Sequence, residues 1–205
     1  MMSQVASQVE LAPVTVQLEP VVHLSLDEFY QFCQINRDLR IERTSAGELA
    51  IMPLTRGASG NRNAEITFQL QRWAKEDGSG VAFDSSTAFA LPNGAVRSPD
   101  ASWVRRERLA RLSEEEKQKF LPLCPDLVVE LRSPSDPRPL LEAKLREYRD
   151  NGARLGLLID PVGRRVQIYR EDGGVEALEG PTTVSGAPVL PGFRLSLDAI
   201  WSLGW

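Results

Sequence analysis

Two charged residues occupy positions where a simple hydrophobic core would place apolar side chains. Glu130 lies within the apolar run of residues 127–131, which predicts a strand buried on both faces. Lys144 falls beside Leu145 in the apolar stripe of a helix predicted over residues 138–151. A buried carboxylate is costly unless it is paired or bound to a cation. Because the helix follows the strand through a short link, we expect the carboxylate and the ammonium to meet at the edge of one sheet.

Two further carboxylates are candidates for the same site. Asp100 stands at the head of an apolar strand, and Glu65 lies at the margin of the apolar face of a helix predicted within residues 57–78. Each also has an ordinary interpretation, Asp100 as a turn aspartate and Glu65 as a solvated helix residue. Glu130 and Lys144 could likewise form only a structural ion pair, with the lysine extending to solvent.

Taken together, these four residues have the chemistry of a phosphodiester hydrolase. Carboxylates from neighbouring strands can hold Mg²⁺ or Mn²⁺, which are hard cations that take oxygen ligands and keep several waters. A nearby lysine can orient or deprotonate the attacking water and stabilise the negative charge that develops on phosphorus. This arrangement needs no histidine, and the chain has a single one, His23.

Several sequence blocks resemble the Uma-two family, a group of restriction-endonuclease-like proteins in the PD-(D/E)xK nuclease superfamily. The blocks are Ser98-Pro-Asp100, Pro125-Asp-Leu-Val-Val-Glu-Leu-Arg-Ser-Pro-Ser-Asp136, Lys144-Leu-Arg-Glu-Tyr-Arg-Asp-Asn-Gly152 and Leu157-Leu-Ile-Asp-Pro161. The resemblance runs from about residue 25 to residue 201. It implies a central mixed β-sheet flanked by helices, with an N-terminal helix and a β-hairpin, and a metal-dependent nuclease site.

The resemblance also assigns roles to the candidate residues. Asp100 would match the first acidic residue, Glu130 the second, and Glu65 the helix acid that often completes the site. In the plain superfamily pattern a lysine lies two residues after the second acid, where this chain has Arg132, which stays protonated and cannot accept a proton from water. In this family the lysine of the following helix takes that place, and it corresponds to Lys144.

The periodicity of the sequence predicts one mixed α/β domain over residues 21–205 and a flexible arm over residues 1–20. In the arm, a short strand is possible near residues 14–18. The main elements expected after it are a helix capped by Ser25, a hairpin ending at Pro53, the helix within residues 57–78, a strand over residues 96–104, and the strand–helix–strand unit of residues 126–160. The tail after Gly173 is expected to hold one last strand or helix around residues 195–201.

Composition excludes several classes of protein. With 24 Lys and Arg against 28 Asp and Glu the net charge is −4, so no broad basic surface for nucleic acid is present. Only two cysteines occur, which gives no disulfide framework and favours a reducing cytoplasm. No apolar run approaches the ~20 residues of a membrane span.

The sequence therefore predicts a cytoplasmic, Mg²⁺- or Mn²⁺-dependent DNA endonuclease. Asp100, Glu130 and Glu65 would hold the metal or its water, and Lys144 would position the nucleophile. A homodimer is expected for an enzyme that cuts both strands. Two alternatives remain open: a non-catalytic nucleic-acid-binding or regulatory protein on the same fold, and a structural protein in which Glu130 and Lys144 form a buried pair.

Overall fold

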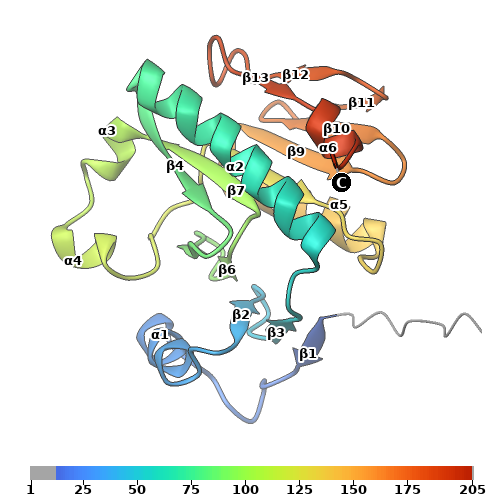
Figure 1. Ribbon diagram of the computed structural model, residues 1–205. Coiled ribbons are helices and arrows are strands. Elements are labelled where there is room, and N and C mark those ends of the chain that lie inside the picture. Colours follow the sequence, from blue (N-terminus) through green and yellow to red (C-terminus); the bar gives the residue numbers. More distant parts are fainter. Residues whose placement is uncertain (1–12, 205) are drawn as a thin grey trace, which may run out of the picture.

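The computed structural model describes residues 13–204, which form three β-sheets and six helices (Figure 1). Residues 1–12 of the predicted arm lie outside the described residues. Farther along the arm, β1 (Val14–Val16) pairs with the N-terminal hairpin. None of the helices described between residues 13 and 204 has the length and apolar character needed to cross a bilayer.

The largest sheet has six strands in the order β11-β10-β9-β8-β7-β4. Their bounds are β4 Gly80–Asp84, β7 Ala101–Arg105, β8 Leu127–Leu131, β9 Leu155–Asp160, β10 Arg165–Arg170 and β11 Val175–Glu179. The strands β8 and β9 are parallel and are joined through α5 (Arg138–Asp150), while the other neighbours are antiparallel. The predicted mixed sheet and its strand–helix–strand unit are therefore confirmed.

A second sheet holds the N-terminal elements and lies below the large sheet in Figure 1. It contains β1, the hairpin β2 (Arg40–Arg43) and β3 (Leu49–Met52), and the short strands β5 (Phe89–Ala90) and β6 (Val96–Arg97). The helix α1 (Leu26–Ile35) begins at the predicted capping box of Ser25 and Glu28. Its Phe29 is fully buried against residues of this sheet.

The prediction of one strand over residues 96–104 was wrong. The chain leaves the second sheet after β6 and enters the large sheet at β7, so residues 98–100 connect two sheets. Pro99 has no N–H to donate to a β-ladder. The Ser98 hydroxyl lies within hydrogen-bond distance of the carbonyl oxygens of Ser85 and Thr87, to which it donates. These two residues end one strand and place Asp100 at the start of the next.

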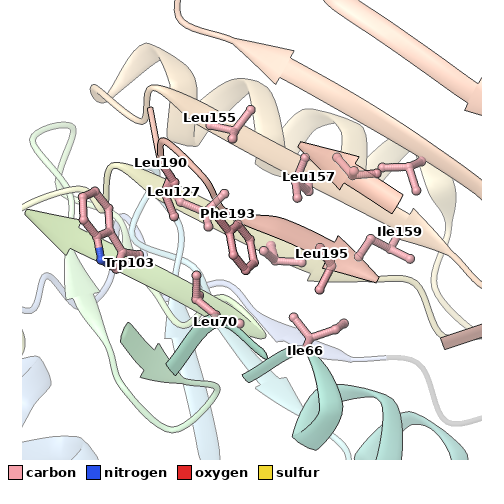
Figure 2. Packing of buried hydrophobic residues seen from close by; sticks show 14 of the residues in the cluster. Ile66, Leu70, Trp103, Leu127, Leu155, Leu157, Ile159, Leu190, Phe193 and Leu195 are labelled. Atoms are coloured by element: carbon pink, nitrogen blue, oxygen red, sulfur yellow. The ribbon is translucent and has the colours of Figure 1, made fainter. Parts of the chain in front are cut away.

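Helices and the tail cover the two faces of the large sheet. On one face α2 (Gly57–Asp77) packs with three elements of the tail, β12 (Thr183–Ser185), β13 (Arg194–Ser196) and α6 (Asp198–Trp201). The tail therefore holds more elements than the single strand or helix that was expected there. Figure 2 shows the core of this face. Its labelled members include Ile66, Leu70, Trp103, Leu127, Phe193 and Leu195.

The opposite face of the large sheet is covered by α5. Leu145 and Tyr148 pack there against Val128 and Leu158, in a cluster completed by residues of the second sheet and of the segment around Leu121. Side chains alternate along β8, so Leu127 and Val129 face α2 while Val128 and Glu130 face α5. Two short helices, α3 (Arg106–Leu109) and α4 (Glu114–Lys117), connect β7 to β8.

We predict that Gly80→Ala destabilises the protein by about 1–3 kcal/mol or more, because a Cβ at this position would overlap the buried indole of Trp103. Gly60→Ala is the matched control. Its Cβ would meet only Thr55 Cγ2 at 3.9 Å, and alanine favours the helix by up to about 1 kcal/mol. Urea unfolding of both variants measures the difference, and equal stability of the two would contradict the packing described here.

Candidate active site

The pairing of β7 with β8 brings the two predicted strand carboxylates to the same end of the sheet. The antiparallel ladder ends at the pair Ala101–Val129, so Asp100 directly precedes the paired part of β7 and Glu130 directly follows that of β8. The backbone N–H of Leu131 donates to Asp100 Oδ2 at 2.8 Å, which fixes the carboxylate against β8. Two acidic groups from distant parts of the chain therefore share one end of the sheet.

The structure brings Lys144 to this pair from α5. Its Nζ lies 2.8 Å from Glu130 Oε1, and the side chain is only 12% exposed. The Tyr148 hydroxyl donates to the same oxygen at 3.1 Å, and Lys144 Nζ lies 5.8 Å from the centre of the Tyr148 ring. The contact between a strand carboxylate and a helix ammonium is the one that the helical stripe predicted.

A second buried carboxylate, Glu42 of β2, also holds Lys144 and was missed by the sequence analysis. Lys144 Nζ donates to Glu42 Oε1 at 3.0 Å, across 102 residues of chain, and the Ser98 N–H donates to the same oxygen. Arg97 lies 3.3 Å from Glu42 Oε2 and 2.6 Å from Glu147 of α5. No local pattern distinguishes Glu42 from a solvated hairpin residue, because its burial results from the packing of the second sheet against α5.

Burial and mutual charge together set the protonation of Glu130, Glu42 and Lys144. Burial raises the pKa of Glu130 to about 7, and the nearby Asp100 and Glu42 carboxylates add to the shift, while Lys144 opposes it. Burial also disfavours the charge on Glu42, yet Lys144 and Arg97 outweigh it and hold the pKa of Glu42 below its ordinary value. Burial alone would lower the pKa of Lys144, but Glu130 and Glu42 raise it above its ordinary value. Lys144 is therefore an ammonium ion.

Two other polar side chains flank Asp100. Asn63 of α2 donates from Nδ2 to Asp100 Oδ1 at 3.0 Å, and Arg40 of β2 contributes a neighbouring positive charge while donating to the Ser98 carbonyl. Burial nevertheless raises the pKa of Asp100. Asn63 Oδ1 and Arg40 Nε are buried, and neither has a hydrogen-bond partner within residues 13–204. Sequence reasoning identified neither residue.

The structure places Glu65 on α2, half-buried, with its Oε1 accepting a hydrogen bond from Gln69 at 2.8 Å. Gln69 in turn bonds both backbone groups of Ser196 in β13. The α2 side chain that is hydrogen-bonded to Asp100 is Asn63, two residues earlier. The role of Glu65 stays a prediction. Arg132, at the position where the plain superfamily pattern has its lysine, forms an ion pair with Asp160 at 2.9 Å.

The oxygen chemistry around Asp100 suits a hard divalent cation. Within the described part of the chain, no group of three or more His, Cys, Asp or Glu side chains could hold a metal ion. Mg²⁺ is nevertheless commonly bound through one or two carboxylates while it keeps several waters. Asp100 and Glu130, which are close enough to affect each other's charge, supply two carboxylates, and the amide of Asn63, whose Oδ1 has no partner within the described residues, is hydrogen-bonded to Asp100. The residues present therefore fit Mg²⁺ or Mn²⁺.

A groove of about 760 Å³ gives solvent a path toward this end of the sheet. It follows one side of α2 and is lined by Asn63, Phe68 and Arg72, with Thr55 and Ser85 also in its wall. Because Asn63 both lines the groove and contacts Asp100, the groove reaches the helix side of the carboxylate. On the α5 side, by contrast, Glu130 is only 4% exposed.

The Glu130–Lys144 contact has two interpretations, a structural ion pair and a part of a nuclease site, and they require different surroundings. A structural ion pair requires only that Lys144 lie beside Glu130, and this contact is common to both interpretations. It does not require a further buried carboxylate nearby, whereas Asp100 lies close enough for its charge to raise the pKa of Glu130. Like charges at close range are costly unless a cation offsets them. The additional acidic group is a feature that a nuclease site needs and an ion pair does not.

Comparison with solved structures defines the fold class. The structure superposes on a crystal structure described as a "putative nuclease belonging to DUF820" from Anabaena variabilis ATCC 29413, with a TM-score of 0.70 and 20% identity. The match covers 87% of this chain and 98% of that one. The predicted α/β fold of the restriction-endonuclease type is thus confirmed as a nuclease-like fold.

Residues 26–198 match the family described as Uma2, "Putative restriction endonuclease", and the chain belongs to this family. No curated protein matches the chain. The family and the fold support a nuclease-like function, and the family's description implies a nucleic-acid substrate.

We predict that the stability of the wild type relative to Glu130→Gln falls as the pH rises from about 4.5 to 7 in a chelating buffer. The folded protein keeps the Glu130 proton up to a pKa of about 7, whereas the ordinary value is 4.5. Stability linked to this proton is therefore fully present below pH 4.5 and is lost as the pH rises through 7. The expected loss is roughly 3 kcal/mol, at about 1.4 kcal/mol per pKa unit.

Urea unfolding at several pH values measures this difference. Glu76→Gln, at an exposed position on α2, controls for the general effect of removing one carboxylate. A difference between the wild type and Glu130→Gln that stays constant with pH would show that burial does not disfavour the charge on Glu130.

Proposed function

We propose that this protein is a Mg²⁺- or Mn²⁺-dependent endonuclease of the PD-(D/E)xK type that hydrolyses DNA phosphodiester bonds. One observation carries the proposal: the N–H of Leu131, next to Glu130 on β8, donates to Asp100 Oδ2, and Lys144 lies 2.8 Å from Glu130. Membership of the Uma2 family and the nuclease-like fold support it.

Each of the four predicted residues has a role in this proposal. Asp100 and Glu130 would hold the cation, which when bound supplies Lewis acidity and lowers the pKa of a water at the site. Glu65 takes the role implied by the family resemblance, supporting the cation or its water from α2. The Leu131 N–H and Asn63 Nδ2 orient the Asp100 carboxylate, and the Tyr148 hydroxyl orients Glu130.

Lys144 positions the nucleophile. An ammonium group has three N–H donors, and Glu130 and Glu42 accept two of them. The third is available to the attacking water or to an oxygen of the scissile phosphate. Because the pKa of Lys144 is raised by these carboxylates, the group acts as a donor and a positive charge and does not take a proton from the water.

The remaining sequence predictions concern partners and location. The groove along α2, whose wall includes Phe68, Arg72 and Lys75, is the route by which a nucleic-acid strand would approach Asp100. A homodimer would provide two sites for the two strands of a duplex. The homodimer and the cytoplasmic location stay predictions, which sedimentation and cell fractionation test.

We predict that Asp100→Asn and Glu130→Gln each lower cleavage of supercoiled plasmid at least about 100-fold with Mg²⁺ or Mn²⁺. Both changes keep the shape of the side chain and remove a charge that the cation requires. Glu176→Gln, on an exposed carboxylate of β11, is the control and should cleave at the wild-type rate.

Two results would contradict the proposed function. The first is undiminished cleavage by purified Glu130→Gln. The second is DNA binding by the wild type that is unchanged by chelation and never followed by cleavage, which would indicate the non-catalytic alternative.

We predict that Glu42→Gln lowers the cleavage rate about tenfold or more while leaving divalent-cation affinity within about twofold of the wild type. The amide still fills the space, but it no longer offers Lys144 a charged acceptor. Rate constants at saturating DNA and a Mn²⁺ titration measure the two effects separately. If Glu42→Gln lowered the cation affinity as much as the cleavage rate, Glu42 would belong to the cation site and its role would not be to position Lys144.

A further inference from the structure

We propose that Asn63 of α2 supplies a third oxygen, its side-chain Oδ1, to the divalent cation held by Asp100 and Glu130. This inference rests on the proposed function, because it concerns the cation of the same site. It adds a neutral ligand that neither the charge pattern of the sequence nor the family assignment indicates.

The first observation is the environment of the Asn63 amide oxygen. Oδ1 is buried, and no hydrogen-bond donor within residues 13–204 contacts it. Most buried side-chain oxygens in proteins have a partner, and those without one commonly face a water or an ion. The oxygen is therefore available to a group that accepts electron pairs.

The orientation of the amide follows from its other end. Asn63 Nδ2 donates to Asp100 Oδ1 at 3.0 Å. Rotating the amide by 180° would set Oδ1 against the carboxylate, and two acceptors would then face each other. The carboxylate therefore requires Nδ2 on its side, which leaves Oδ1 without a donor among the described residues.

The chemistry of the surroundings is that of a cation site. Asp100 and Glu130 contribute carboxylate oxygens, and Asn63 adds an amide oxygen of the kind that Ca²⁺ and related hard cations accept as a ligand. Asn63 also lines the groove beside α2.

The geometry of α2 favours Asn63 over Glu65 for this role. Residues two apart on a helix point in different directions, so only one of the two can face Asp100 directly. Glu65 accepts from Gln69, which is held by Ser196 of β13, whereas Asn63 is bonded to Asp100 itself. Glu65 would then act at most through water.

The test is Mn²⁺ binding to the full chain without nucleic acid, measured by isothermal titration calorimetry. We expect Asn63→Ala to weaken binding about tenfold or more. Asn63→Asp keeps an oxygen but loses the N–H donor, and it should bind at least as tightly as the wild type. Asn61→Ala, at an exposed asparagine on the same helix, is the matched control and should leave the affinity unchanged.

The variants separate a ligand from a residue that only positions Asp100. If the Nδ2 hydrogen bond were the whole contribution, both Asn63→Ala and Asn63→Asp would weaken binding, and the inference would be wrong. It would also be wrong if Asn63→Ala bound Mn²⁺ within twofold of the wild type, or if only Glu65→Gln weakened binding. Thermal unfolding checks that each variant is folded.

Crystals soaked in Mn²⁺ give a second readout that does not depend on affinity. We expect an anomalous peak within about 2.5 Å of Asn63 Oδ1 and of both carboxylates. A peak on the carboxylates alone would overturn the inference and leave the proposed function standing. No Mn²⁺ binding by the wild type, or undiminished binding by Asp100→Asn, would overturn the proposed function itself.

Discussion

The candidate site depends on the electrostatics of three carboxylates gathered with one ammonium group at the end of the large sheet. Glu42, Glu130 and Asp100 come from three strands, and burial disfavours the charge on each of them. Lys144 contacts two of the three and offsets part of their repulsion. Arg97 and Arg40 add positive charge beside Glu42 and Asp100, yet the pKa values of Glu130 and Asp100 stay raised. A divalent cation bound by these two carboxylates would stabilise the charge that burial disfavours.

The same contacts connect the two sheets. Lys144 and Glu147 of α5 reach Glu42 and Arg97 of the second sheet, so the N-terminal elements are joined to the large sheet through charged groups as well as through the apolar cluster around Phe89. The segment of residues 98–100 carries the chain from one sheet to the other and delivers Asp100 to the start of β7. Architecture and site chemistry thus depend on one connection.

In the proposed site the lysine comes from a helix. The position two residues after Glu130 is Arg132, whose guanidinium pairs with Asp160. Lys144, one strand–helix connection later, reaches Glu130 from the face of the sheet that α5 covers. The proposed mechanism requires an ammonium group near the second acid, and either a strand or the following helix can provide it.

The sequence by itself determined the elements with strong periodicity and the residues that violate it. The run of residues 127–131, the stripe of α5 and the charged residues Glu130 and Lys144 within them were readable because burial of a charge conflicts with the local pattern. Only the tertiary structure decided that Asp100 lies near Glu130, that Glu42 contacts Lys144, and that Asn63 is hydrogen-bonded to Asp100. Those contacts join residues that look ordinary locally, and strand register and sheet packing alone bring them together.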